Sequence, residues 1–154
     1  MAVKPIPDGY QSVIPYLIID GAAKAIDFYT AVLDAKEFVR MDGPDGKVGH
    51  AEIRIGDSVV MLADEFPDMG ARGPKSIGGT PMSIVVYLPD VDATFAKALE
   101  HGATELDPLE DKFYGDRMGT FEDPFGHKWN VATHVEDVPE EEMQKRAKEA
   151  MENM

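Results

Sequence analysis

The feature that most constrains this chain is an order of elements that occurs twice within its 154 residues. An apolar run of strand length over residues 13–19 precedes a helical pattern over 20–35, and three more strand patterns end at residue 64. Residues 82–134 repeat this order, with the helical pattern over 89–102. Because a repeated supersecondary unit determines the architecture, the repeat predicts two βαβββ modules.

The helical patterns are recognised by apolar spacing and by their ends. The first has Asp20 as a plausible N-cap, and the second begins with Pro-Asp and stops at Gly102. We predict an α+β fold in which two tandem βαβββ modules, residues 10–66 and 82–136, form curved mixed sheets around a cleft. A linker loop over 67–81 joins them, and a helix over 137–154 follows.

The connection and the tail each leave two interpretations open. Residues 64–81 contain four Gly and three Pro, which suits either a binding loop or a plain spacer between modules. In the tail, Asp137 and Glu140 resemble a capping box, and Glu142 and Arg146 are spaced as an i,i+4 pair, as are Glu141 and Lys145. The apolar face of the tail helix, rich in Met, would pack on the sheet or on a second subunit.

Composition excludes several classes of function. The formal net charge of -14 repels phosphate backbones, so we expect no nucleic-acid partner; it favours neutral or cationic small molecules or simply solubility. Without cysteine there is no disulfide or thiolate zinc site. No apolar run approaches the roughly 20 residues that span a bilayer, and the N-terminus lacks a signal-peptide pattern. We expect a cytoplasmic protein without membrane contacts.

Three stretches resemble one known family. PYLIIDGAAKAIDFY (15–29), HAEIRIGDSVVMLADE (50–65) and DPFGHKWNVATHVED (123–137), together with the repeat, resemble the vicinal oxygen chelate superfamily. This superfamily includes glyoxalase I, bleomycin-resistance proteins and extradiol dioxygenases, and the likeness is greatest to its PhnB-like branch. The resemblance spans about residues 10–138. Since this fold hosts unrelated reactions, the function has to be argued from the site.

The resemblance also implies where a metal would bind. In metal-using members, the first and last strands of each module each supply one ligand. The corresponding positions here are Ile14, Met61, Ser83 and Asn130, or, one residue away, Pro15, Val60, Met82 and Trp129. Neither set contains a carboxylate or an imidazole, the groups that hard divalent cations prefer. We therefore predict no metal and no cofactor.

The four histidines offer few alternatives. His101 suits the last turn of a helix, and His127 suits a strand start after a turn. His50 shares a strand face with Glu52 and Arg54, and His134 falls on the same face of its strand as Asn130. A His50–Glu52–His134 metal site is conceivable, but solvated strand charges explain the same residues.

The stretch FYGDRMGTFEDPFGHKW (113–129) divides into two parts. Asp123, Pro124 and Gly126 form a turn by their chemistry, and alternation places Trp129 in the core. In FYGDR, the Tyr114 ring and the five donors of Arg117 are candidates for contacting a ligand; in the alternative interpretation, Asp116 simply pairs with neighbours of Arg117 at the surface.

We predict a glyoxalase- or bleomycin-resistance-like homodimer that binds a small organic molecule in a metal-free cleft. The candidate ligand-binding residues are Tyr16, His50, Glu52, Met61, Tyr87, Tyr114, Arg117, Asn130 and His134. One alternative is an enzyme, either a metal-dependent lyase or dioxygenase with a rebuilt site or a metal-free catalyst with His50 or His134 as base. Another is an interaction protein whose surface is the acidic tail helix.

The donor chemistry makes a testable prediction about metal content. Elemental analysis of the protein purified without a His tag should find no stoichiometric metal, since the implied ligand positions have no carboxylate or imidazole. Thermal shift measured against Mg, Mn, Fe(II), Ni and Zn should be flat. Strong stabilisation by one ion would contradict this prediction and would direct attention to His50, Glu52 and His134.

Overall fold

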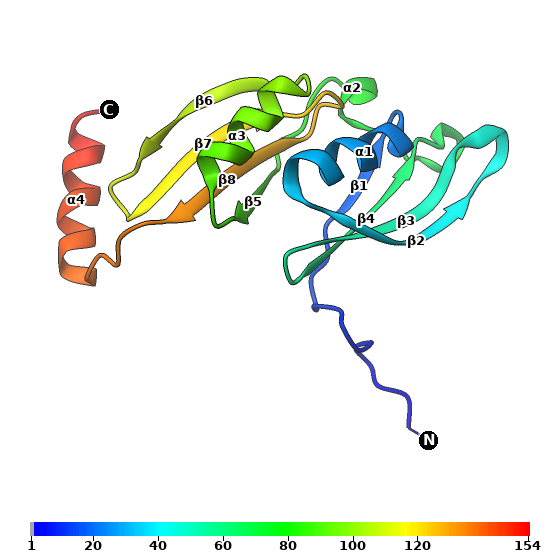
Figure 1. Cartoon of the computed structure of the whole chain (residues 1–154), viewed down its shortest axis with the longest axis horizontal. Helices are drawn as coiled ribbons and strands as arrows, with labels where there is room; N and C mark the ends of the chain where they lie inside the picture. Colours follow the sequence, from blue (N-terminus) through cyan, green and yellow to red (C-terminus); the bar gives the residue numbers. More distant parts are fainter. Residues whose placement is uncertain (1) are drawn as a thin grey trace. The chain divides into compact units, whose positions relative to one another are not determined.

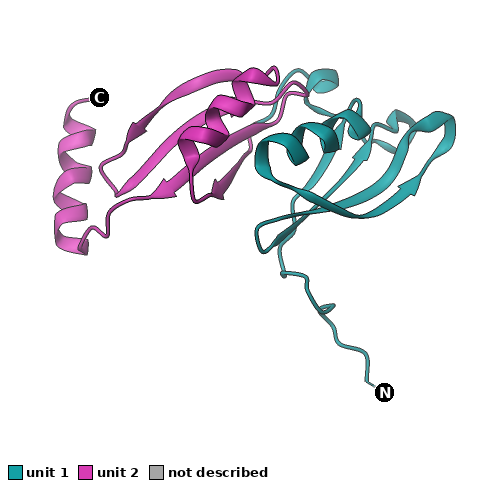
Figure 2. Ribbon diagram, viewed as in Figure 1, with its two compact units in different colours: residues 1–80 teal, residues 81–154 magenta. Residues whose placement is uncertain are grey.

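The computed structural model describes residues 2–154. The chain divides into two compact units, residues 1–80 and 81–154 (Figure 2). Each unit contains one four-stranded mixed sheet and one long helix that packs on it, so the predicted pair of βαβββ modules is confirmed. The cleft between modules stays a prediction, and the two units are described separately below.

Unit 1 has the strand order β1-β4-β3-β2, with β1 parallel to β4 and the other neighbours antiparallel (Figure 1). Its elements are β1 (Tyr16–Ile19), α1 (Ala22–Leu33), β2 (Lys36–Asp42), the 3₁₀ turn η1 (Pro44–Gly46), β3 (Val48–Ile55) and β4 (Ser58–Asp64). The parallel pair follows from the crossover through α1, because a parallel neighbour cannot be reached by a tight turn.

The core of unit 1 lies between α1 and one face of the sheet. Tyr29 of α1 and Ile19, Ile53 and Leu62 of the strands are completely buried. Because side chains alternate along a strand, the residues between them point to the other face. That face, which we call the open face of unit 1, carries Tyr16, Ile18, His50, Glu52 and Met61.

The start of α1 is held by a residue that is distant in sequence. Asp20 does not cap the helix: the N-cap is Gly21, with a positive φ and no side-chain cap. The carboxylate of Asp64, buried at the end of β4, instead accepts hydrogen bonds from the backbone N–H groups of Gly21 and Ala22, both at 3.0 Å. Its second oxygen accepts from Val48 N at 2.7 Å. One buried carboxylate thus joins β4, β3 and the helix N-terminus, where negative charge is favourable.

Unit 2 repeats the arrangement with strand order β5-β8-β7-β6. Its elements are β5 (Ser83–Tyr87), α3 (Val91–Glu100), β6 (Thr104–Asp111), β7 (Asp116–Glu122), β8 (Lys128–His134) and α4 (Glu140–Glu152). Asp90 caps α3, accepting from Ala93 N at 3.1 Å. The open face of unit 2, opposite α3, carries Ser83, Val85, Tyr87, Met118, Thr120, Asn130 and Ala132.

The turn before β8 is organised by a second buried carboxylate. Asp123 is 2% exposed, and its Oδ1 accepts from Phe125 N at 2.9 Å and from His127 N at 3.0 Å. Its Oδ2 accepts from the indole Nε1 of Trp129 at 2.9 Å. Trp129 is fully buried, as alternation predicts, so the DPFG segment connects a turn to the core of unit 2.

The connection between modules is more ordered than the sequence suggests. It contains a 3₁₀ turn, η2 (Pro67–Met69), and a short helix, α2 (Pro74–Ile77), so the prediction of a loop is wrong in part. Glu65 Oε2 accepts from Gly73 N at 2.6 Å, and hydrogen bonds from the Ser76 side chain and then from the Gly73 backbone lower the pKa of Glu65. A carboxylate with local donors therefore organises this segment.

The tail helix begins later than predicted. α4 starts after Pro139 without a side-chain cap, so the Asp137–Glu140 capping box does not form; Asp137 contacts His134 instead. The Glu142–Arg146 pair is present at 3.1 Å. Arg146 also donates to Phe113 O and pairs with Glu136. No residue of α4 is buried, and packing of its apolar face on a second subunit stays a prediction.

Gly115 provides a test of how the segment before α4 is held against the sheet of unit 2. Its O accepts from Val135 N and Glu136 N, its φ is +97°, and a Cβ there would lie 2.1 Å from Glu136 O. Gly115→Ala should therefore lower the free energy of unfolding by about 2–4 kcal/mol, combining backbone strain with a steric clash. The measurement is urea denaturation followed by Trp129 fluorescence.

Gly102→Ala is the matched control, because Gly102 has φ +99° but its added Cβ would meet only Pro124 Cγ at an ordinary 3.6 Å. We expect this variant to lower the free energy of unfolding by about 1 kcal/mol, through backbone strain alone. Equal losses in the two variants would mean that the contact with Glu136 O does not constrain the tail.

Candidate functional site

Four polar side chains form a continuous chain on the open face of unit 1. The Tyr10 hydroxyl donates to Glu52 Oε1, and the other carboxylate oxygen, Oε2, lies 2.7 Å from His50 Nε2. His50 Nδ1 lies 2.8 Å from the hydroxyl oxygen of Tyr16. The predicted proximity of His50 and Glu52 is thus present, and Tyr16 joins them.

Local structure explains this convergence. His50 and Glu52 are two apart on β3, so they share a face, and Tyr16 and Glu52 are both opposite Met61 of β4. Before β1 begins, the side chain of Gln11 pairs with the backbone of Val59, donating to O at 2.7 Å and accepting from N at 3.2 Å. This amide continues the sheet ladder and holds Tyr10 over the sheet.

Along this series of hydrogen-bonded side chains, burial increases from Tyr16 through His50 to Glu52. Tyr16 is 48% exposed, the His50 side chain is 23% exposed and the Glu52 side chain only 10%. Although burial alone raises the pKa of Glu52, the hydrogen bonds from Tyr10 and His50 outweigh it and lower the pKa. Burial, and then the nearby Glu52 charge, raise the pKa of Tyr16, so its phenol keeps its proton at neutral pH. The hydrogen-bonded series therefore extends from the ionised, buried carboxylate of Glu52 to the protonated, accessible hydroxyl of Tyr16.

Unit 2 has a comparable polar cluster. The Tyr87 hydroxyl donates to Asp116 Oδ2 at 2.6 Å, and His134 Nδ1 lies 2.8 Å from Asp116 Oδ1. His134 Nε2 lies 2.7 Å from Asp137. Asp116 is 4% exposed and contacts Tyr87 and His134, so the alternative in which it pairs with neighbours of Arg117 at the surface is wrong.

The two tyrosines lie on the first strands of their modules but not at the same position of the repeat. Tyr16 pairs with Met61, and its counterpart in unit 2 is Val85, which pairs with Asn130; Tyr87 lies two residues further along β5 and pairs with Ala132. His50 on β3 and Asp116 on β7 contact the tyrosine hydroxyl of their unit. Both sheets thus carry one tyrosine hydroxyl with one ionisable partner on the open face, at positions that are offset by two residues between the modules.

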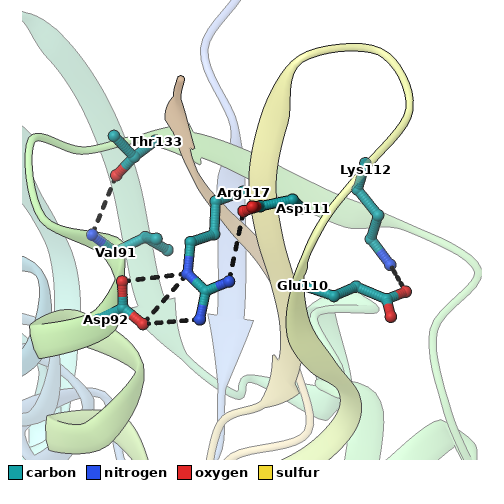
Figure 3. A network of polar contacts seen from close by, with 7 residues as sticks. All are labelled: Val91, Asp92, Glu110, Asp111, Lys112, Arg117 and Thr133. Carbon is teal, nitrogen blue, oxygen red and sulfur yellow. Dashed lines mark hydrogen bonds and ion pairs between the residues drawn. The ribbon is translucent and has the colours of Figure 1, made fainter. Parts of the chain in front are cut away.

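Tyr114 and Arg117, which are close in sequence, lie in different surroundings. The Tyr114 hydroxyl contacts Met118 Sδ at 3.3 Å on the open face of unit 2. The guanidinium of Arg117 instead contacts Asp92 in the first turn of α3 and Asp111 of β6 (Figure 3). Its partners place Arg117 on the helix side of the sheet, and a ligand would have to displace two carboxylates. We therefore do not include Arg117 in the candidate site.

Asn130 is part of a neutral network. Its amide donates to Ser83 Oγ at 2.7 Å, and its carbonyl oxygen accepts from Thr120 Oγ1 at 2.5 Å. Ser83 and Asn130 are two of the positions that the resemblance assigns to metal ligands, and their donors are a hydroxyl and an amide. Met61 offers only a thioether, so this donor set does not fit a hard divalent cation. Among residues 2–154, no group of three or more His, Cys, Asp or Glu side chains is placed to hold a metal.

The structure thus brings Tyr16, His50, Glu52 and Met61 together in unit 1, and Tyr87, Tyr114 and His134 together in unit 2. His134 contacts Asp116 and Asp137 of its own unit. Sequence reasoning missed Tyr10 and Gln11, because the polar stretch before β1 has no periodicity. It also missed the role of Asp116, although its spacing of two from Met118 places both on one strand face.

Comparisons with known proteins place the chain in a family. Residues 13–131 match the family model of the Glyoxalase/Bleomycin resistance protein/Dioxygenase superfamily. Protein Mb0911c of Mycobacterium bovis is 48% identical over 133 residues, which cover 84% of this chain and 88% of that protein. No helix among residues 2–154 has the length and apolar character needed to cross a membrane.

Solved structures share the fold. A PhnB protein from Bacillus cereus aligns with a TM-score of 0.63 and 21% identity, covering 80% of this chain and 99% of the other. TnmS3 from Streptomyces sp. CB03234, an antibiotic binding protein, aligns with a TM-score of 0.60 and 21% identity, covering 88% and 99%. At these identities the likeness concerns the fold alone.

The His134 contacts make a prediction about pH. Hydrogen bonds to Asp116 and then to Asp137 raise the pKa of His134 above its usual value. A raised pKa in the folded state stabilises the protein below the unfolded value of about 6.5, and that stabilisation is lost as pH rises through the folded pKa. NMR titration of the imidazole should give a raised pKa, and Asp137→Asn should lower it.

Asp57→Asn serves as the control, because Asp57 is exposed and its carboxylate accepts a hydrogen bond from the Ser58 hydroxyl. The stability difference between wild type and Asp137→Asn should also shrink as pH rises above the His134 pKa. An unchanged pKa in Asp137→Asn would show that the contact with Asp137 does not persist in solution.

Proposed function

The chain belongs to the Glyoxalase/Bleomycin resistance protein/Dioxygenase superfamily, and we propose that it binds a small organic molecule through the open faces of its sheets. The proposed contacts are Tyr16, His50 and Met61 in unit 1 and Tyr87, Tyr114, Asn130 and His134 in unit 2. Glu52 acts behind His50 and does not itself have to touch the ligand. No metal is assigned a role.

The observation that carries the proposal is a pair of exposed tyrosines with oriented hydroxyls. Tyr16 is 48% exposed and Tyr87 is 61% exposed, on the sheet faces that lack a helix. Each hydroxyl is fixed by an ionisable partner, His50 or Asp116. An aromatic ring with a fixed polar end supplies both apolar contact and directional hydrogen bonding, the combination found in small-molecule sites.

Apolar neighbours add contact area around both tyrosines. Ile18 and Met61 are half-buried on the open face of unit 1, and Val85 is 53% exposed on that of unit 2. Such side chains gain free energy when a ligand covers them, at about 25 cal/mol per Å² of apolar area. The antibiotic-binding TnmS3 is an example of this fold with a small-molecule ligand.

The metal-dependent alternative is less well supported by the geometry. A rebuilt site would need His50, Glu52 and His134 as ligands, but His50 and Glu52 are already hydrogen-bonded to Tyr16 and Tyr10. The neutral donors at Ser83, Thr120 and Asn130 already satisfy one another. Each set would have to exchange existing hydrogen bonds for a cation.

The proposal is tested with a panel of neutral and cationic aromatic compounds, screened by ligand-observed NMR and quantified by titration calorimetry. Tyr16→Phe or Tyr87→Phe should weaken binding of at least one hit about fivefold, because each removes one hydrogen bond of roughly 1 kcal/mol. Lys24→Gln, on the exposed side of α1, should leave Kd unchanged. A panel without hits, or hits unaffected by both tyrosine variants, would contradict the proposal.

A further inference from the structure

The polar chain of unit 1 has the order of a proton relay. An exposed hydroxyl (Tyr16) contacts a half-buried imidazole (His50), which contacts a buried carboxylate (Glu52). The three groups are linked through different atoms of the imidazole, Nδ1 on one side and Nε2 on the other. A proton accepted at Nδ1 would therefore create an imidazolium whose Nε2–H already faces a carboxylate.

The hydrogen-bond partners fix the resting proton positions. Ionised Glu52 only accepts, and Tyr10 already donates to its Oε1, so Oε2 takes the Nε2–H of His50. With its Nε2–H directed at Glu52, the imidazole presents Nδ1 as an acceptor, and Tyr16 donates its O–H to it. This leaves the lone pairs of the Tyr16 oxygen to accept from a donor group of a bound molecule.

We propose that Tyr16, His50 and Glu52 form a relay that removes a proton from a ligand with a weakly acidic hydroxyl group, a phenol or an enol. The inference rests on the proposed small-molecule binding and specifies its ligand class and chemistry. The ligand O–H breaks as its proton bonds to the Tyr16 oxygen, while the original Tyr16 proton bonds to His50 Nδ1. The ligand becomes an oxyanion and His50 an imidazolium, and nothing is oxidised or reduced.

The charge balance favours this ligand class. The net charge of -14 repels anions at long range, so a neutral hydroxyl compound approaches more easily than an anion that is already ionised. Once formed, the oxyanion lies near the imidazolium, which Glu52 in turn stabilises. Met41, opposite His50 on β2, carries no charge, and Arg54, two residues beyond Glu52, contacts Gly9 O and the Phe38 ring.

Unit 2 lacks this relay although it also has an exposed tyrosine on its first strand. Tyr87 donates directly to the carboxylate of Asp116, and Thr120, which pairs with Asn130, stands where unit 1 has Glu52. No imidazole lies between the hydroxyl and the carboxylate there. The two modules therefore differ in the chemistry of their open faces, and proton removal is assigned to unit 1 alone.

The test uses 4-nitrophenol, whose phenol and phenolate forms absorb at different wavelengths. Bound to the wild-type protein, the dye should be more ionised than free dye in the same buffer, with its ionisation constant raised about tenfold. At saturating dye, His50→Gln should return the ionisation of the bound dye to that of free dye, whatever its effect on Kd, since glutamine hydrogen-bonds without accepting the proton. Tyr16→Phe should lose the effect, and Glu52→Gln should reduce it.

His101→Gln is the matched control, because His101 lies exposed at the end of α3 and its Nδ1 contacts the helix backbone at Lys97 O. A second measurement needs no variant: the His50 Cε1–H resonance should move to its imidazolium position when the dye binds. A dye that binds in neutral form, ionises equally in His50→Gln, or does not bind overturns the relay. Hits elsewhere in the aromatic panel would then preserve the proposed binding function.

Discussion

The constraint on which the rest of the structure depends is that each four-stranded sheet is covered by one helix. α1 and α3 bury the apolar residues of one sheet face, and the side chains between those residues point to the other face. An uncovered face in water has to carry polar groups or offer its apolar groups to a ligand. Both kinds are present here, which is why every candidate functional residue except Arg117 lies on or beside an open face.

The duplication of this arrangement explains why the site has two related halves. A tyrosine on the first strand and an ionisable residue on the third strand meet in both modules, because the strand order is the same and the same sheet face is left open. Their partners differ: an imidazole in unit 1 and a carboxylate in unit 2. A repeated backbone can thus present similar groups on both open faces, while different partner residues change the chemistry.

The strands and helices could be predicted from the sequence because their signals are local and periodic. The interactions that hold them often could not, since they join distant residues: Asp64 replaces Asp20 at the start of α1, and Tyr10 reaches Glu52 from outside the sheet. The local pattern at Asp137 predicts a capping box, but the carboxylate contacts His134 at the end of β8 instead. Placing Arg117 required the position of Asp92 on α3, which no pattern within β7 reveals.

Buried charge distinguishes structural acids from functional ones. Among residues 2–154, four carboxylates are buried, those of Glu52, Asp64, Asp116 and Asp123, and a buried charge needs hydrogen-bond donors to be tolerated. Asp64 is satisfied by backbone N–H groups and Asp123 by backbone N–H groups and an indole, none of which titrates near neutral pH. Glu52 and Asp116 are satisfied by tyrosine and histidine side chains that reach accessible faces. Backbone donors fix a fold, whereas titratable donors connect a buried charge to a ligand on the accessible face. Glu52 and Asp116 therefore identify where chemistry can occur.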